Sequence, residues 1–328
     1  MLDKWFFNGE EIETVSSFKY LGFVFANTGK FSKGIDHVEL QGQRALFNMY
    51  SSVKNFDSMD IDMQMSLFNS LVTSVLSYAC EIWGFAQAKK VELVQLKFLK
   101  QILKVRKSTP TCMVYRECNK LPLYITRMFR ILNYWLKLIN LDVNDPLRIL
   151  YDTSIMLNQN NTFINNTSCC WALNVKQMLY KNGFGYIWEN QHMGVDKGFI
   201  NIFKRRLTDS FWQDNKAEID GLSRNRLYRH LDIENIFYLT VLPNNFIRTA
   251  LTKLRLGSHH LMIERGRWSN IIFEDRKCLL CDELEDEFHF VVTCVKYHDL
   301  RVKYLPKSLY IKPSMLKFID FLNSKNEN

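Results

Sequence analysis

Three cysteines and one histidine lie close together near the C-terminal end of the chain, at the spacing C-x2-C-x7-H-x4-C. They are Cys278, Cys281, His289 and Cys294. Zinc prefers four thiolate or imidazole ligands in a tetrahedron, and two thiols separated by two residues can bind one ion from a single turn. Because protein side chains would fill all four positions, the pattern predicts a closed structural zinc site with no position left for water.

The alternative interpretation is a set of ordinary buried cysteines beside a surface histidine, since cysteine is often buried without binding a metal. The apolar residues around the cluster are few, namely Phe288, Phe290, Val291 and Val292. So small an apolar group cannot fold a module unaided. On the zinc interpretation, metal binding therefore supplies folding free energy to this segment.

The chain as a whole carries a basic surplus. Its 328 residues include 43 Lys and Arg against 34 Asp and Glu, a formal net charge of +9. Apolar residues make up 47% and charged residues 23%, which is typical of a globular protein and excludes a disordered one. The surplus favours an anionic partner, either nucleic acid or an acidic membrane surface.

Much of this surplus lies between residues 89 and 107, where seven basic residues stand against one acid, Glu92. The pattern predicts an amphipathic helix whose lysines share an arc of roughly 100°. Like charges on one helix face repel each other, so the stripe either contacts phosphate or is a plain solvated face. Its lysines are Lys89, Lys90, Lys97, Lys100, Lys104 and Lys107.

A second basic segment spans residues 246–268, immediately before the cysteine cluster. Its arginine side chains suit phosphate groups and base edges. The two histidines of this segment, His259 and His260, have no cysteine near them in sequence and are not expected to bind metal. The residues predicted to contact nucleic acid here are Arg248, Lys253, Arg255, Arg265 and Arg267.

The elements that position these residues are mainly helical. Trp5-Phe6-Phe7 followed by Asn8-Gly9 predicts a β-hairpin, and a second apolar stretch at 18–25 predicts further β structure. From about residue 35 onwards the apolar spacing is helical. We predict a β-hairpin remnant at 1–34, a helical thumb-like domain at 35–156, a polar linker at 157–169, a helical region at 170–270 and a zinc module with its tail at 271–328.

Five of the eight cysteines remain outside the cluster. An odd remainder with no signal peptide indicates a reducing compartment, so we expect the protein in the nucleus or cytoplasm and not secreted. The most apolar window, residues 67–86, contains several polar side chains and is interpreted as a buried helix and not a membrane span.

Short motifs follow one another along the chain in an informative order. They are Phe18-Lys-Tyr20-Leu21-Gly22, then Leu76-Ser-Tyr-Ala79-Cys80-Glu81-Ile-Trp83-Gly84, then the basic Lys97-Phe-Leu-Lys100. Next come Thr249-Ala-Leu-Thr-Lys253-Leu-Arg255, His260-Leu-Met-Ile-Glu264-Arg-Gly266-Arg267 and the Cys278 cluster. Together they resemble the C-terminal part of reverse transcriptases of non-LTR (LINE-type) retrotransposons. The resemblance implies a primer-grip hairpin at Phe18, Tyr20, Leu21 and Gly22, followed by a thumb and a Cys/His module.

The same family holds its catalytic metals with an Asp-Asp pair, and this chain contains no such pair. We therefore expect a nucleic-acid-binding fragment with no catalytic residues, inactive alone as an RNA-directed DNA polymerase. Its expected partners are the backbone of RNA or DNA and the missing palm and fingers portion, with structural zinc as cofactor and no membrane. The alternatives are a zinc-stabilised protein-interaction module with no nucleic-acid role and an active polymerase. The latter would use candidate carboxylates such as Asp57, Asp60 and Asp62.

Overall fold

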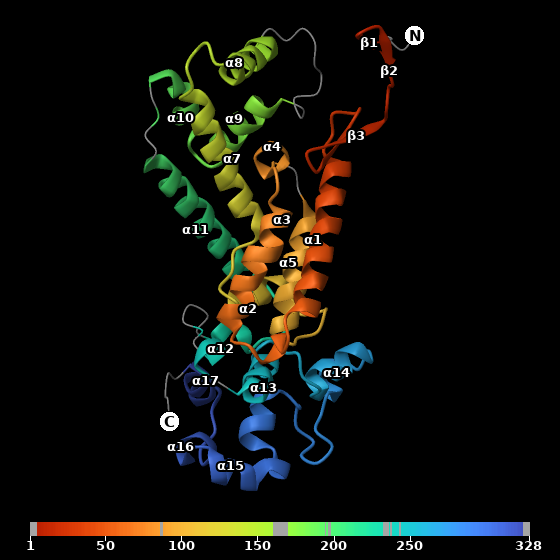
Figure 1. Ribbon diagram of the computed structural model, residues 1–328. Helices are drawn as coiled ribbons and strands as arrows, with labels where there is room; N and C mark the ends of the chain where they lie inside the picture. The colour runs from red at the N-terminus through yellow and green to blue at the C-terminus, as the bar shows by residue number, and fades with distance from the viewer. Residues whose placement is uncertain are drawn as a thin grey trace. The chain divides into compact units, whose positions relative to one another are not determined.

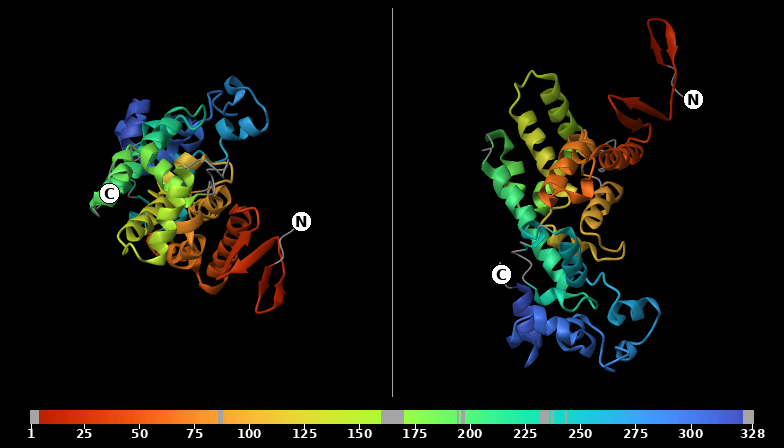
Figure 2. Two further views of the ribbon diagram at one scale, coloured as in Figure 1. Left: turned by 90° about the horizontal axis from the view of Figure 1, so that it is seen from above. Right: turned by 60° about the horizontal axis from the view of Figure 1, so that its bottom comes forward.

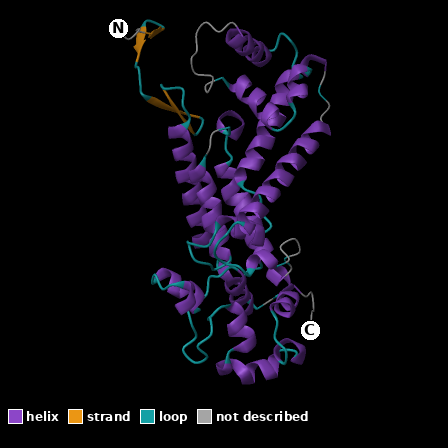
Figure 3. Cartoon of the chain, turned by 180° about the vertical axis from the view of Figure 1, so that it is seen from behind, coloured by secondary structure: helices purple, strands orange, loops and turns teal. Residues whose placement is uncertain are grey.

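The computed structural model of the chain is mainly helical, as predicted (Figures 1 and 3). It describes residues 5–85, 88–159, 170–193, 195, 198–231, 236, 238–242 and 244–323. The strands are β1 (Trp5–Phe7), β2 (Glu10–Ile12), β3 (Ser17–Tyr20) and β4 (Phe23–Ala26). The first helices are α1 (Ser32–Ser52), α2 (Ile61–Phe68), α3 (Ser74–Leu76), α4 (Cys80–Trp83), α5 (Lys89–Ile102), α6 (Thr111–Glu117), α7 (Leu123–Ile139) and α8 (Pro146–Gln159). The remaining helices are α9 (Trp171–Lys181), α10 (Gly185–Glu189), α11 (Gly198–Asp220), α12 (Tyr238–Val241), α13 (Asn245–Arg255), α14 (Met262–Trp268), α15 (His298–Tyr304), α16 (Lys307–Tyr310) and α17 (Met315–Asn323).

These elements form two compact units that interleave along the chain. Unit 1 contains residues 1–54, 66–95 and 121–211, and unit 2 contains residues 55–65, 96–120 and 212–328. Each unit therefore combines segments from several of the predicted linear domains, whose boundaries stay a prediction. Of the predicted linker at 157–169, residues 160–169 lie outside the described residues, and 157–159 end helix α8.

The N-terminal β structure consists of two hairpins (Figure 2). The Asn8-Gly9 turn predicts the first, and the second lies where the resemblance implies a hairpin. In the first hairpin Phe7 pairs with Glu10, and the turn residues Asn8 and Gly9 both have positive φ, at 48° and 86°. In the second, Tyr20 pairs with Phe23 across a Leu21-Gly22 turn with φ values of 45° and 87°. Two positive φ values are the geometry of the tight turns that match the strand twist, and glycine adopts them at little cost.

The second hairpin is anchored on helix α1 by one aromatic side chain. Phe23 is buried, and its ring stacks on that of Trp83 with centroids 6.3 Å apart. Gly34 of α1 faces the same ring, and a Cβ at this position would lie 2.1 Å from Phe23 Cζ. The glycine therefore permits a close helix–hairpin approach that any larger residue would prevent.

A second cluster of aromatic side chains forms the core between helices α7 to α11 of unit 1. Trp135 of α7 is fully buried, stacks on Trp188 at a centroid distance of 6.1 Å and donates its indole N–H to Tyr151 Oη at 2.8 Å. Tyr151 in turn donates to Gln191 Oε1 at 2.6 Å. The polar atoms of Trp135 and Tyr151 are thus hydrogen-bonded, which removes the cost of burying them.

In unit 2 a buried carboxylate organises the packing of α6 against α12 and α13. Glu117 accepts hydrogen bonds from Arg255 Nε at 2.7 Å, Tyr228 Oη at 2.8 Å and Tyr238 Oη at 2.5 Å. The side chains of Glu117 and Arg255 are 0% and 4% exposed. A buried charge is tolerated only when it is paired and hydrogen-bonded, and this network meets both conditions.

Among the described residues, no helix combines the length and apolar character that a membrane span would need.

The contact between Gly34 and Phe23 leads to a stability prediction. Gly34→Ala should destabilise the protein by about 1–3 kcal/mol, because overpacking against a rigid ring outweighs the better helix propensity of alanine. Chemical denaturation followed by circular dichroism measures this change. Arg44→Ala on the exposed side of the same helix serves as control and should change stability little; a stabilised Gly34→Ala protein would contradict the predicted contact.

Candidate metal centre and basic surface

The four residues of the predicted zinc site come together in unit 2. The ligand atoms of Cys278, Cys281, His289 and Cys294 all lie within 4.8 Å of one another. Cys294 Sγ is 4.0 Å from Cys278 Sγ and 3.9 Å from Cys281 Sγ. In a tetrahedral zinc site with Zn–S bonds near 2.3 Å, two sulfur atoms are about 3.8 Å apart. The cluster can therefore hold a metal ion, and its dimensions fit zinc.

Local backbone geometry explains how the thiols converge. A tight turn follows Cys278, where Asp282 N donates to Cys278 O at 3.0 Å and Cys278 N donates to Glu283 O at 2.8 Å. Asp282 has a φ of 52°, a conformation that aspartate tolerates better than most residues. At the other end, a π-helical turn at His289–Thr293 brings Cys294 N to within 2.8 Å of His289 O. The turn thus places the last thiol beside the first two.

The imidazole of His289 is oriented for metal binding by its Nδ1 atom. Nδ1 lies 3.0 Å from Glu283 Oε2 and 3.0 Å from Thr293 Oγ1. An ionised carboxylate can only accept a hydrogen bond, so Nδ1 carries the ring proton and Nε2 presents its lone pair. Nε2 is buried and has no hydrogen-bond partner among the described residues. A carboxylate behind a histidine ligand is the usual outer-shell arrangement at zinc sites.

One thiol of the cluster, Cys278, differs in acidity from the thiols buried elsewhere. Burial opposes ionisation of Cys278, but the backbone N–H groups of Leu280 and Cys281 hydrogen-bond to its sulfur and lower the pKa of the thiol to about 7. Burial raises the pKa of Cys80 and of Cys112 to about 12, with a nearby carboxylate adding to each shift. Within the cluster the shifts differ, because burial raises the pKa of the Cys294 thiol.

The predicted basic helix is confirmed over Lys89–Ile102 and wrong beyond it. The chain leaves the helix at Lys104, whose φ is 52°. Val105 N donates to Lys100 O, and Lys104 N donates to Gln101 O, at 3.1 Å and 3.0 Å. These two bonds form the left-handed cap that ends many helices, so Lys104 and Lys107 belong to the following loop.

The one acid of the segment does not face the lysines. Glu92 turns inward in unit 1, where it accepts from Arg127 Nη1 at 2.7 Å and from Leu123 N at 2.8 Å. Burial raises the pKa of Glu92, and the charge of Arg127 opposes that shift. Lys90 pairs with Asp36 at 2.7 Å on the surface of unit 1. Lys89, Lys97, Lys104 and Lys107 are exposed, while Lys100 is half-buried.

The loop after α5 is held by basic side chains of unit 2, and we define residues 103–109 as the basic loop. Lys100 Nζ donates to Lys107 O at 2.5 Å, and Arg224 Nη2 donates to Ser108 O at 3.0 Å. Burial lowers the pKa of Lys100, and the nearby charge of Arg224 lowers it further. Two cations held this close would both gain from an anion at the same place.

Three basic residues of this surface were not among the predicted nucleic-acid contacts, namely Arg106, Arg224 and His260. Arg106 N donates to Ser258 Oγ at 2.9 Å, and Arg106 Nη2 lies 3.2 Å from His260 Nδ1. The contacts join residues more than a hundred positions apart, which no local sequence pattern reveals. Only the clustering of basic residues in each segment separately could have suggested them.

The second basic segment requires a correction. Arg248 and Arg255 lie on the buried face of α13, with exposed fractions of 7% and 4%, and Arg255 is paired with Glu117. Neither side chain can reach phosphate, so both leave the predicted set. Lys253 is half-buried, and Arg267 pairs with Glu264 beside the ring of Trp268. Arg265 is exposed beside Met262.

The side chains of the hairpin motif lie on the surface of unit 1. Phe18, Tyr20 and Leu21 are exposed. Tyr78 donates its hydroxyl hydrogen to Leu21 O, and a Cβ on Gly22 would lie 3.6 Å from the ring of Tyr78. Trp83 donates its indole N–H to Tyr78 O at 2.8 Å. The first two motifs of the chain are therefore in direct contact.

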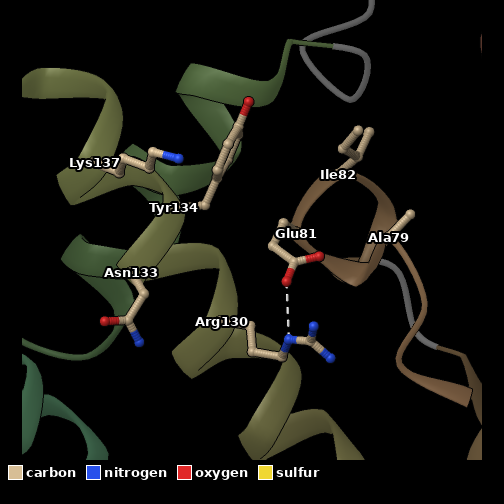
Figure 4. A pocket seen from close by; sticks show the side chains of 7 residues that line it. All are labelled: Ala79, Glu81, Ile82, Arg130, Asn133, Tyr134 and Lys137. Carbon is tan, nitrogen blue, oxygen red and sulfur yellow. Dashed lines mark hydrogen bonds and ion pairs between the residues drawn. The ribbon is translucent and has the colours of Figure 1, made fainter. Parts of the chain in front are cut away.

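A shallow hollow of about 490 Å³ lies between α4 and α7 of unit 1 (Figure 4). Arg130 Nε donates to Glu81 Oε1 across it at 2.8 Å, and Arg130 Nη1 donates to Ser77 O at 3.1 Å. The ion pair fixes the short helix α4 on α7. The hollow is lined by Ala79, Glu81, Ile82, Arg130, Asn133, Tyr134 and Lys137.

Comparison of the chain with protein-family models, with curated proteins and with solved structures gives no match in any of the three.

The cluster geometry predicts one tightly bound zinc ion per chain. Cys281→Ala should lose most of the metal, because three remaining ligands no longer complete the tetrahedron. Metal analysis of the purified full-length chain gives the stoichiometry. Cys170→Ala, a cysteine outside the cluster, should retain one zinc; equal metal content in both variants would contradict the assignment.

The position of Glu283 predicts a supporting role in metal affinity. Glu283→Ala should weaken zinc binding about 10–100-fold, since the carboxylate fixes the His289 tautomer and increases its basicity. Competition with a chromogenic chelator measures the affinity. Glu274→Ala changes an exposed carboxylate outside the cluster and is expected to leave the affinity unchanged.

Proposed function

We propose that this chain binds nucleic acid, as the C-terminal, thumb-containing part of a non-LTR retrotransposon reverse transcriptase with a structural zinc ion. The observation that carries the proposal is the basic loop with its neighbours in unit 2. Lys100 and Arg224 are held close together there, and Lys104 and Lys107 extend the same loop. Phosphate groups would remove the repulsion that this arrangement creates.

The charge balance around the loop supports phosphate as the ligand. Within the described part of the chain, Lys97, Lys104 and Lys107 form no ion pair, and the acid of their segment, Glu92, is paired internally with Arg127. A solvated helix face normally mixes charges of both signs, because opposite pairs stabilise it and like pairs destabilise it. Contacts of this kind give affinity without sequence preference.

The contact between the two N-terminal motifs supports the family resemblance. Leu21 and Gly22 of the hairpin meet Tyr78, and Phe23 meets Trp83, although the motifs are more than fifty residues apart. Ala79, which stands where the family motif often has glycine, has a φ of 52°. A left-handed conformation at this position is the physical reason for a glycine there.

Zinc is the metal that we propose for the Cys3His cluster. Thiolate and imidazole ligands in a tetrahedron favour zinc over the oxygen-preferring magnesium and calcium. Four protein ligands leave no open position, so the ion supplies folding free energy to residues 278–294 and no catalysis. Zinc thiolates require reduced cysteines, which supports the nucleus or cytoplasm as the place of action.

We also propose that the chain alone is inactive as a polymerase, because its sequence contains no Asp-Asp pair. Asp57 and Asp62 stand in the first turns of helical segments, where a carboxylate stabilises the helix N-terminus. A primer-extension assay of the isolated chain with Mg²⁺ or Mn²⁺ should give no product.

A protein-binding role is the second candidate function, and strand β1 favours it. Trp5, Phe6 and Phe7 are 67%, 62% and 71% exposed on a hairpin of two strands. An exposed apolar group of this kind marks a contact surface, and isolated two-stranded hairpins are only marginally stable. Phe23 of the second hairpin does not extend this exposed surface, because it is buried against Trp83.

The phosphate proposal predicts a specific salt dependence. Replacing Lys97, Lys104 and Lys107 together by Gln should reduce the slope of log K against log salt by about 2–3, at just under one unit per lost phosphate contact. Fluorescence anisotropy with a labelled single-stranded RNA at several salt concentrations gives the slope.

Three exposed lysines of unit 1 provide the matched control, namely Lys30, Lys33 and Lys54. Their replacement by Gln removes the same charge and should leave the slope unchanged. If both triple variants lower the slope equally, binding follows net charge alone and the basic loop is not the site.

A further inference from the structure

A short segment of unit 2 connects the candidate metal centre to the basic loop. Residues 258–263 follow α13 and run into α14, and their contacts reach both sites. We name them the bridging segment. The sequence pattern places them in the second basic segment but assigns them no role in linking the two sites.

On the side of the basic loop, the bridging segment holds Arg106. Ser258 Oγ accepts from Arg106 N at 2.9 Å, and His260 Nδ1 accepts from Arg106 Nη2 at 3.2 Å. Ser258 is buried, so its hydroxyl fixes the loop backbone from inside. The orientation of Arg106 therefore depends on where the bridging segment lies.

On the side of the metal centre, the same segment is held by two carboxylates between Cys281 and His289. His259 Nε2 lies 2.8 Å from Glu287 Oε1, and both side chains are 12% exposed. Met262 N donates to Glu285 Oε2 at 2.8 Å, and Ile263 N donates to Glu285 O at 3.1 Å. Three contacts to the cluster's own connecting chain thus position a segment only six residues long.

The connecting chain depends on the metal for its shape. Its apolar support is small, with Val292 as a buried side chain and Phe288 and Phe290 half-buried. So small an apolar group cannot fold the module unaided, so without an ion the module loses its fold. Glu285 and Glu287 would then no longer hold the bridging segment in place.

We propose that metal occupancy of the Cys278 cluster strengthens phosphate binding at the basic loop, and that the bridging segment carries the coupling. This inference rests on the proposed function. Linkage is reciprocal, so nucleic acid should raise the affinity of the chain for zinc by the same factor. Coupling of this type typically changes affinity by roughly tenfold.

The binding experiment compares the zinc-loaded full chain with the chelator-treated chain, using a short fluorescein-labelled oligouridylate. We expect affinity to fall roughly tenfold on chelation in the wild-type protein. His259→Ala should reduce this ratio markedly, and His259→Gln, which can still donate to Glu287, should restore much of it. His298→Ala, an exposed histidine of α15, is the matched control and should leave the ratio unchanged.

Amide hydrogen exchange tests the coupling without nucleic acid. Chelation should reduce the protection of amide hydrogens at residues 103–109, where the Arg106 N–H donates to Ser258 Oγ. The amides of α7 in unit 1 should remain protected. Loss of protection in both places would overturn the inference, because the metal would then support the whole chain.

The two proposals fail in different ways. If the zinc-loaded chain does not bind the oligouridylate, the proposed function fails and the coupling to phosphate fails with it. If it binds with the same affinity after chelation, or if residues 103–109 stay protected, only the coupling is wrong.

Discussion

A buried imidazole nitrogen facing three thiols is the interaction on which this structure depends most. His289 Nε2 has no hydrogen-bond partner among the described residues, while Nδ1 is held by Glu283 and Thr293. An unsatisfied buried polar atom costs about 1–3 kcal/mol, and a metal ion removes that cost. The same ion would neutralise the thiolates that gather beside it. Arg301, itself buried, donates to Cys294 O and fixes the last ligand from behind.

The sequence was sufficient to predict this centre because its information is local. Spacing alone brings four ligands within one short segment, and the Asn8-Gly9 turn is an equally local signal. The helical character of the chain also follows from apolar spacing over successive turns. What spacing could not supply was the second hairpin, since its turn residues are a leucine and a glycine and not a typical turn pair.

The errors concern charged residues whose partners are distant in sequence. Arg255 belongs to a basic segment, yet Glu117 lies 138 positions away and neutralises it in a buried network. Glu92 similarly pairs with Arg127. The one acid of the lysine segment therefore does not neutralise the lysines on the surface. A count of charges in a segment cannot tell a paired, buried group from a solvated one. The basic surface that remains is smaller than predicted, but it gains Arg106 and Arg224 from outside the predicted set.

The proposed centre is a metal ion bound by three sulfur atoms and one nitrogen. X-ray absorption at the zinc edge, on the purified full-length chain, observes that coordination directly. We predict three sulfur neighbours at about 2.3 Å and one nitrogen at about 2.0–2.1 Å. A shell of oxygen and nitrogen without sulfur, or a chain that holds no zinc, would contradict it.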